Sequence, residues 1–158
     1  MLALKLLGSF FILLAGFLAA VTLARFERQK CSVPEAWVDL LLYIQEQIDC
    51  YLTPIDMILA ATDPSILKEC MCRTESPTLE DLLQASAPYL NRDCMRRLSA
   101  FVREIGGGYR EEQLRRCEYY IQALRKCCDK LSAELPARIK LNVTLSICAA
   151  IATTILLW

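Results

Sequence analysis

Two long runs without a charged residue, one at each end of the chain, constrain the fold most strongly. The first covers nineteen residues, 6–24, and the second covers eighteen, 141–158. A helix rises about 1.5 Å per residue, so each run would be roughly 27–29 Å long. That length matches the hydrocarbon core of a bilayer, which is about 30 Å thick. Asn142 and Trp158 lie at the edges of the second run, where polar and aromatic residues suit the interface. The runs therefore predict two transmembrane helices.

Each run has an alternative interpretation. The first could be a cleaved signal peptide with Lys5 as its basic N-terminal region, but the apolar part of a signal peptide is normally about 7–15 residues long, and this run is longer. The second could be a buried core helix, but it shows no polar face, which a terminal helix of a soluble protein needs. We therefore expect an N-terminal transmembrane helix over residues 1–24, a helical bundle over 25–140 and a C-terminal transmembrane helix over 141–158.

Basic residues near the inner ends of the runs predict the orientation. Three follow the first run and five precede the second: Arg25, Arg28, Lys30, Arg125, Lys126, Lys130, Arg138 and Lys140. Lys and Arg concentrate on the cytoplasmic side of membranes, so we expect the middle region to be cytoplasmic.

That region holds 17 of the 18 basic residues and all 18 acidic residues, a net charge of −1. We expect no nucleic acid partner, because binding phosphates requires a basic face.

Nine cysteines and the absence of histidine limit the chemistry of any site. Zinc sites and catalysis that depend on histidine are excluded. A four-cysteine metal site from Cys70, Cys72, Cys127 and Cys128 would lack the usual spacing of such pairs. A disulfide framework would require a middle region outside the cytoplasm. We expect most cysteines to act as small buried apolar residues. We predict no catalytic, cofactor-binding or metal-ligating residue, no cofactor and no enzymatic activity.

Capping signals divide the middle region into helices. Ser32-Val33-Pro34-Glu35 has the form of a capping box, with proline in the first turn. Similar starts are predicted at Thr53-Pro54, Asp63-Pro64 and Ser76-Pro77, with Thr78–Asp81 as an alternative to the last. The expected helices cover residues 33–52, 54–61, 64–72, 77–87, 92–105 and from 110 into the second apolar run.

We interpret five arginines as a solvated face, with an acidic partner or anionic lipid as the alternative: Arg92, Arg96, Arg97, Arg103 and Arg110.

Three glycines at 106–108 separate the last two expected helices. They lack the Lys-Ser/Thr pair of a phosphate-binding loop, so we predict a helix cap and hinge. The helix that follows has a seam with alternating spacings of three and four residues: Leu114, Cys117, Ile121, Leu124, Cys128, Leu131 and Leu135. Such a seam needs a partner, either the helix at 92–105 or a second copy of the chain, which leaves a homo-oligomer open. We expect Pro136 to kink this helix.

Three features of the sequence together resemble a known family. One is the short chain with a spanning helix at each end. Another is a helix that leads into a Thr-Pro-Ile turn, at residues 48–55. The third is a glycine-marked turn before a long helix that contains Gln113 and Gln122 and runs into the second apolar run. This layout resembles the stage III sporulation protein AB family of endospore-forming bacteria. The chain departs from the family pattern in its Gly-Gly-Gly turn, in Pro136 and in its many cysteines.

The resemblance implies an all-α, membrane-anchored bundle of about six helices, similar to the cytoplasmic domain of type II secretion platform proteins. It implies a non-enzymatic platform of the channel between mother cell and forespore, on the mother-cell side of the outer forespore membrane. The implied partners are the lipid bilayer, other channel proteins and a cytoplasmic ATPase similar to stage III sporulation protein AA. The alternatives are a platform protein of another type II secretion or pilus-like system, and a cysteine-based redox or metal protein.

Overall fold

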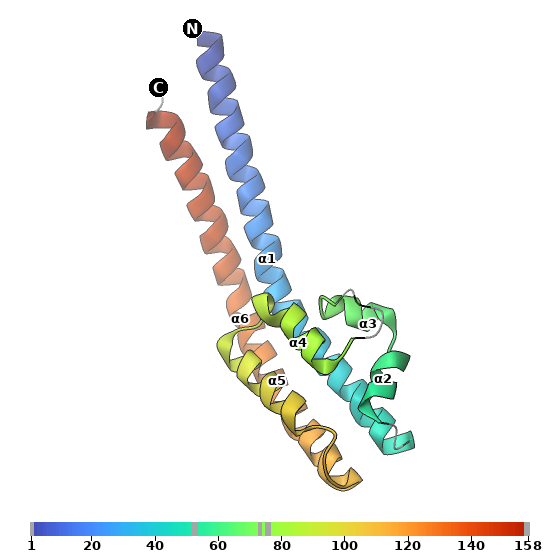
Figure 1. Cartoon of the computed structure of the whole chain (residues 1–158). Coiled ribbons are helices and arrows are strands. Elements are labelled where there is room, and N and C mark those ends of the chain that lie inside the picture. Colours follow the sequence, from blue (N-terminus) through green and yellow to red (C-terminus); the bar gives the residue numbers. More distant parts are fainter. Residues whose placement is uncertain (1, 52–53, 73, 75–76, 157–158) are drawn as a thin grey trace. The chain divides into compact units, whose positions relative to one another are not determined.

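The computed structural model describes residues 2–51, 54–72, 74 and 77–156, without the side chains of residues 2–6, 9 and 56. In these ranges the chain forms six α-helices and one 3₁₀-helix, and no strand (Figure 1). The elements are α1 (Leu2–Tyr51), α2 (Ile55–Ala61), α3 (Pro64–Glu69), α4 (Leu79–Ser86), η1 (Ala87–Tyr89), α5 (Arg92–Glu104) and α6 (Arg110–Leu156). The predicted all-α fold of about six helices is confirmed.

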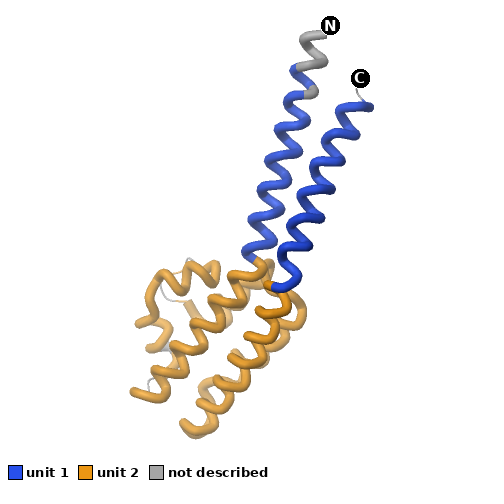
Figure 2. The backbone as a smooth tube through the Cα atoms, turned by 180° about the vertical axis from the view of Figure 1, so that it is seen from behind, with its two compact units in different colours: residues 1–29, 133–158 blue, residues 30–132 orange. Residues whose placement is uncertain are grey.

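The chain divides into two compact units (Figure 2). Unit 1 combines Met1–Gln29 with Ala133–Trp158, so it contains the first part of α1 and the last part of α6. Unit 2 is the continuous segment Lys30–Ser132, which contains the remaining helices and the inner parts of α1 and α6. Each unit is described below by itself.

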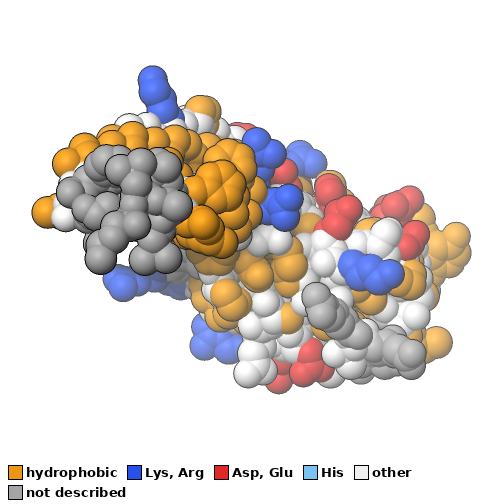
Figure 3. Space-filling view, turned by 90° about the horizontal axis from the view of Figure 1, so that it is seen from above, with side chains coloured by type: hydrophobic (Ala, Val, Ile, Leu, Met, Phe, Trp, Pro, Cys, Tyr) orange, Lys and Arg blue, Asp and Glu red, His pale blue; other side chains and the backbone are white. Residues whose placement is uncertain are grey.

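Unit 1 is a pair of apolar helices whose large side chains face outwards. Phe10, Phe17, Leu145 and Ile155 are all exposed, and apolar side chains gather on the surface of the terminal segments (Figure 3). Among the described residues, α1 and α6 are the helices long and apolar enough to cross a membrane. Exposed aliphatic and aromatic side chains are unfavourable in water and favourable in hydrocarbon. The structure thus agrees with two candidate membrane spans.

Small residues let the two helices of unit 1 approach each other closely. Ala20 and Ala150 are buried. A Cβ atom built on Gly16 would lie 2.6 Å from the Cβ atom of Ala150 and 3.7 Å from the carbonyl oxygen of Ser146. Gly16 and Ala20 are four residues apart, as are Ser146 and Ala150, so each pair lies on one face of its helix. This small-xxx-small pattern is the one by which membrane helices pack closely.

The predicted helix start at residue 33 is wrong, because α1 continues through this point with Pro34 inside it. A proline inside a helix cannot donate to the carbonyl four residues earlier and destabilises by about 3 kcal/mol. However, Val33, Pro34 and Trp37 are all fully buried. Burying each large apolar side chain contributes about 1.5–3 kcal/mol. Burial of these residues therefore outweighs both the cost of the proline and the local signal for a new helix start.

The short helices begin close to their predicted caps. The carboxylate of Asp63 accepts a hydrogen bond from the backbone N–H of Ser65 at 2.8 Å, at the start of α3. α4 begins at Leu79 rather than 77, because Thr78 and Asp81 form the alternative capping box. The Thr78 hydroxyl accepts from the Asp81 N–H at 3.2 Å, and the Asp81 carboxylate accepts from the Thr78 N–H at 3.0 Å. The predicted caps Thr53 and Ser76 lie outside the described residues.

The predicted end of α3 at residue 72 is also corrected, because the helix ends at Glu69. Met71 has a φ of 65°, in the left-handed region that no helical residue adopts. α4 ends at Ser86 and is followed by the 3₁₀ turn η1, while α5 starts and ends within one residue of the prediction. The Asn91 side chain caps α5 by accepting from the Cys94 N–H at 2.7 Å.

The core of unit 2 is built around Trp37. Its indole Nε1–H donates to the Ser86 hydroxyl at 2.9 Å, and both residues are fully buried. The same hydroxyl oxygen lies 2.8 Å from the carbonyl oxygens of Cys70 and Leu82. One buried hydroxyl therefore links α1, α4 and the turn after α3. Apolar residues surround it, among them Leu41 and Leu82, which are also fully buried.

The predicted seam of α6 faces this core. Its central residues Cys117, Ile121, Leu124 and Cys128 are buried, Leu114 and Leu131 pack against the core, and Leu135 belongs to unit 1. Tyr120 of α6 packs edge-on against Phe101 of α5, with ring centroids 5.6 Å apart. Cys128 of α6 lies beside Val38 of α1. The seam is therefore buried within the chain, on both α5 and α1.

Candidate functional site

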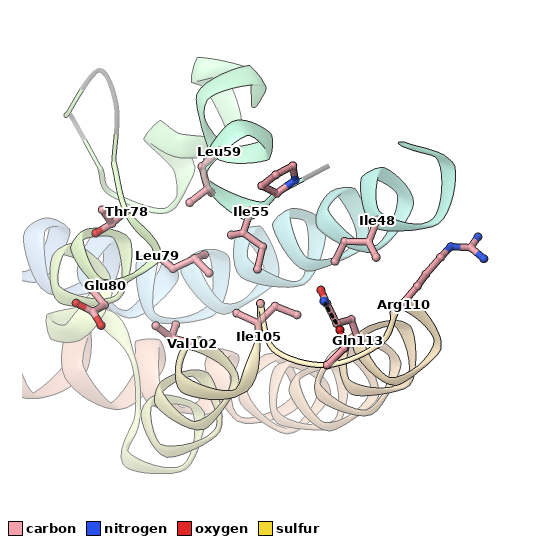
Figure 4. Close-up of a pocket in the computed structure, with 13 residues that line it drawn as sticks. Ile48, Ile55, Leu59, Thr78, Leu79, Glu80, Val102, Ile105, Arg110 and Gln113 are labelled. Atoms are coloured by element: carbon pink, nitrogen blue, oxygen red, sulfur yellow. Dashed lines mark hydrogen bonds between the residues drawn. The ribbon is translucent and has the colours of Figure 1, made fainter. Parts of the chain in front are cut away.

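A groove with a volume of about 630 Å³ opens to solvent in unit 2 (Figure 4). Its walls come from α1, α2, α4, α5, the glycine turn and the start of α6. None of the residues that line it was predicted from the sequence as a site residue, because the groove combines short stretches from distant parts of the chain. The lining residues are Ile48, Pro54, Ile55, Leu59, Thr78, Leu79, Glu80, Val102, Ile105, Gly106, Gly108, Arg110 and Gln113.

Aliphatic side chains form the walls of the groove. Ile48 of α1, Ile55 of α2, Leu79 of α4 and Ile105 of α5 point toward one another in Figure 4. Ile48 and Leu79 are buried, whereas Ile55, Val102 and Ile105 are only half-buried. The half-buried residues keep part of their apolar surface in contact with water. The groove can therefore bind apolar side chains, which would displace that water.

The glycine turn forms one edge of the groove. Gly106 and Gly108 have φ values of 91° and 97°, which L-residues with side chains rarely adopt. The turn is held by α6, because Gln113 Nε2 donates to the Gly108 carbonyl at 3.3 Å. Arg116 Nη1 donates to the Glu104 carbonyl and, at 3.3 Å, to the Gly107 carbonyl. α5 ends at Glu104, just before the three glycines, as predicted, and these hydrogen bonds give the turn a defined shape. The predicted hinge motion stays a prediction.

Charges around the groove do not balance. The Arg110 guanidinium points away from the cavity (Figure 4) and pairs with the carboxylate of Asp49. Arg116, which holds the turn, pairs with Glu112 at 2.6 Å. Glu80 lines the groove at the opposite side of the view from Arg110, and no described cation pairs with it. The two arginines are neutralised by carboxylates, so Glu80 gives the groove a net negative character.

Three large side chains on the segments that contribute lining residues are exposed to solvent. Tyr51, at the end of α1, is 71% exposed, Met57 of α2 is 63% exposed, and Tyr109 is 87% exposed. Tyr109 stands between the lining residues Gly108 and Arg110. Tyr51 and Met57 belong to α1 and α2, which also contribute lining residues. Large exposed apolar side chains are typical of a surface that contacts a partner. The exposed apolar side chains make this region a candidate binding surface.

The cysteines lie mainly in the core, as predicted. Six are buried, Cys127 is half-buried, and Cys50 and Cys148 are exposed; the described residues form no disulfide. Burial raises the pKa of Cys70 to about 12, that of Cys117 to about 11 and that of Cys128 to about 12. These thiols are protonated near neutral pH and are therefore poor nucleophiles.

The predicted arginine face carries local ion pairs. Arg96 and Arg97 both pair with Asp93 of the same helix, at 2.7 and 3.4 Å. The Cys127 thiol lies 3.6 Å from the same carboxylate. Burial alone would raise the pKa of Asp93, but the charge of Arg97, the Cys127 hydrogen bond and the charge of Arg96 together lower it. These pairs agree with the interpretation of a solvated face.

Metal ligands do not converge in the part of the chain that the structure describes. No group of three or more Cys, Asp or Glu residues is placed to hold an ion there. Cys70 and Cys72 lie in the turn after α3, whereas Cys127 and Cys128 lie on α6. The absence of catalytic and cofactor-binding residues remains a prediction from the sequence.

Comparison with known proteins gives one match. A family model described as stage III sporulation protein AB matches residues 5–158. The match covers 154 of the 158 residues (158 − 5 + 1), so it includes both apolar segments and all of unit 2. No curated protein and no solved structure matches the chain.

Proposed function

Because the chain belongs to the stage III sporulation protein AB family, we propose that it is a non-enzymatic membrane platform of the channel between mother cell and forespore. It couples a cytoplasmic ATPase, similar to stage III sporulation protein AA, to the membrane-embedded channel proteins. The family match over residues 5–158 is the observation that carries the role in stage III of sporulation. The family resemblance implies a fold similar to type II secretion platform proteins, and this implied fold is the basis for proposing the coupling to an ATPase.

The architecture supports a platform. α1 and α6 are each long and apolar enough to cross a membrane. Both helices also continue into unit 2, where their inner parts contribute much of the packed core. A protein bound to unit 2 would thus act directly on helices that also carry the apolar segments. A platform needs such a continuous connection between partner and membrane.

The distribution of basic residues supports the location that we propose. We place unit 2 in the mother-cell cytoplasm and the apolar segments in the outer forespore membrane. Arg25 and Arg28 follow the first apolar run, and Arg138 and Lys140 precede the second. Basic residues on the inner side of both spans favour a cytoplasmic middle region.

The side-chain chemistry supports the absence of enzymatic activity. The chain has no histidine, and three of its buried thiols have a raised pKa. Several carboxylates are occupied in local ion pairs, including Asp49, Asp93 and Glu112. An ATPase partner would then supply the chemical energy that this chain cannot release by itself.

Deletion of the gene in its native host tests the sporulation role. We expect normal vegetative growth and an arrest after the forespore has been engulfed. Timed microscopy with a membrane dye measures the stage at which sporulation stops. Expression of the intact gene from a second locus should restore heat-resistant spores. Normal spore formation, with a defect in secretion or pili instead, would favour the alternative platform role in another secretion or pilus-like system.

Direct binding tests the coupling to the ATPase. The full chain in lipid nanodiscs should bind the purified ATPase of the same host, measured by biolayer interferometry, while empty nanodiscs should not. Absence of binding, with both proteins folded and the ATPase active, would contradict the coupling and leave the sporulation role without this partner.

A further inference from the structure

We propose that the groove between α1, α2, α4 and α5 binds an amphipathic helix of the partner ATPase. The bound helix would carry aliphatic side chains on the face toward the groove and a lysine or arginine next to them. The inference deepens the proposed function and rests on it, since it gives the ATPase a docking surface and states the chemistry of the segment that docks. Unit 2 contains all residues of this surface.

The apolar walls select an aliphatic or aromatic ligand face. Ile55, Val102 and Ile105 are half-buried and turn their remaining apolar surface into the cavity. The volume of about 630 Å³ lies within the range of about 300–1,000 Å³ that binding cavities usually have. A helix that places apolar residues three and four positions apart presents a ridge that fits such a groove.

The charge around the groove selects a basic partner. Arg110 and Arg116 are each paired with a carboxylate, which reduces their attraction for an acidic ligand. Glu80 lines the groove without a described cationic partner. A lysine or arginine of the bound helix would complete an ion pair with Glu80, whereas an acidic residue there would be repelled.

The groove is formed before any partner binds. The Thr78–Asp81 capping box fixes the start of α4, which carries Leu79 and Glu80. Hydrogen bonds from Gln113 and Arg116 fix the glycine turn on the other edge. A preformed surface loses little conformational entropy on binding, so a modest apolar contact is sufficient for a useful affinity.

Two substitutions test the groove in the full chain in nanodiscs, with the purified ATPase as the probe. Val102→Trp fills the cavity, and Glu80→Lys reverses the charge of an exposed lining residue that no described cation pairs with. We expect each to weaken ATPase binding about tenfold or more, as for residues central to an interface. Arg96→Trp on another face of α5 and Glu69→Lys on α3 are matched controls outside the groove, and they should leave binding unchanged. Thermal unfolding verifies that each variant is folded. If the Val102→Trp variant is unfolded, the test rests on the Glu80→Lys variant alone.

A photo-crosslinker at residue 107 identifies what binds. A Cβ atom added at Gly107 meets no atom within 4 Å, and the φ of Gly107 is not positive, so a residue with a side chain, such as benzoylphenylalanine, can be placed there. We expect a crosslink to an ATPase peptide that combines aliphatic residues with lysine or arginine, found by mass spectrometry. If wild-type chain binds the ATPase but both groove variants bind equally well, or the crosslinked peptide is acidic, the docking proposal is wrong while the proposed function stands. If the wild-type chain does not bind the ATPase, the docking proposal and the coupling to the ATPase are both wrong, while the sporulation role still rests on the family match.

Discussion

At the scale of single residues, the hydroxyl of Ser86 joins separate parts of the unit 2 core. It accepts from the Trp37 indole at 2.9 Å, and both residues are fully buried. We expect Ser86→Ala to leave the indole N–H buried without an acceptor, which destabilises the fold by about 1–3 kcal/mol. Chemical unfolding of the full chain in detergent micelles, followed by circular dichroism, measures the change.

A double-mutant cycle separates this hydrogen bond from other effects of Ser86→Ala. Trp37→Phe removes the indole N–H, so Ser86→Ala should destabilise the Trp37→Phe background less than it destabilises the wild-type chain. The coupling should be about 1 kcal/mol, within the range for contacting residues. Strict additivity of the two substitutions would show that the hydrogen bond contributes nothing to stability.

The carboxyl of Asp81 provides a pH-dependent contribution to the fold. Its pKa is lowered from 3.8, first by the hydrogen bond from the Thr78 backbone N–H and second by that from the Thr78 hydroxyl. A lowered pKa in the folded state gives stability that is fully present above the unfolded pKa and is lost as pH falls through the folded pKa. We therefore expect Asp81→Asn to lower the melting temperature at neutral pH.

The difference between wild-type chain and Asp81→Asn should shrink as the pH falls below 3.8. Melting curves recorded from about pH 7 down to about pH 3 test this, because other carboxyl groups titrate alike in both proteins. A difference that stays constant over the whole range would mean that the Asp81 charge does not stabilise the cap.

At the scale of elements, sequence signals located most helices but not their exact limits. Asp63 and the Thr78–Asp81 box mark real helix starts because their side chains satisfy backbone N–H groups locally. Such signals depend only on neighbouring residues, so they can be predicted from sequence. The box at Ser32 has the same form, yet α1 passes through it, because tertiary packing of Val33 and Trp37 decides there.

The groove could not be predicted in the same way. Ile48, Leu79 and Ile105 are far apart in sequence, and each fits an ordinary amphipathic helix. Their convergence depends on the packing of four helices and on the shape of the glycine turn. The sequence predicted a turn at residues 106–108, but not that it forms one edge of a cavity.

The helix pair of unit 1 depends on close approach at Gly16. A Cβ atom there would lie 2.6 Å from the Cβ atom of Ala150, a distance that requires the helices to move apart. We expect Gly16→Leu to destabilise unit 1 by about 1–3 kcal/mol, as overpacking usually does. Hydrogen exchange of the full chain in nanodiscs should show faster exchange around Ser146 and Ala150.

Gly8 offers a matched control for this substitution. It lies on the same helix, and a Cβ atom added there meets no atom within 4 Å. Gly8→Leu should therefore leave hydrogen exchange in unit 1 unchanged. Equal effects of the two substitutions would show that loss of glycine itself, rather than contact with Ala150, is responsible.

At the scale of the whole molecule, the proposed role requires that unit 2 faces the cytoplasm, and the native Cys50 can report this. Cys50 is exposed in unit 2, whereas Cys70, Cys117 and Cys128 are buried with a raised pKa and should react slowly. We expect a membrane-impermeant maleimide to label Cys50 only after protoplasts are permeabilised, with the labelled peptide identified by mass spectrometry.

Cys50→Ser should abolish the labelled peptide, which assigns the signal to this residue rather than to the half-buried Cys127. Labelling of Cys50 in intact protoplasts would place unit 2 outside the cell. An ATPase that uses cytoplasmic ATP could not then reach the groove, so both the coupling role and the docking proposal would be wrong. Protection in intact protoplasts, with labelling after permeabilisation, would place the groove in the compartment where the ATPase works.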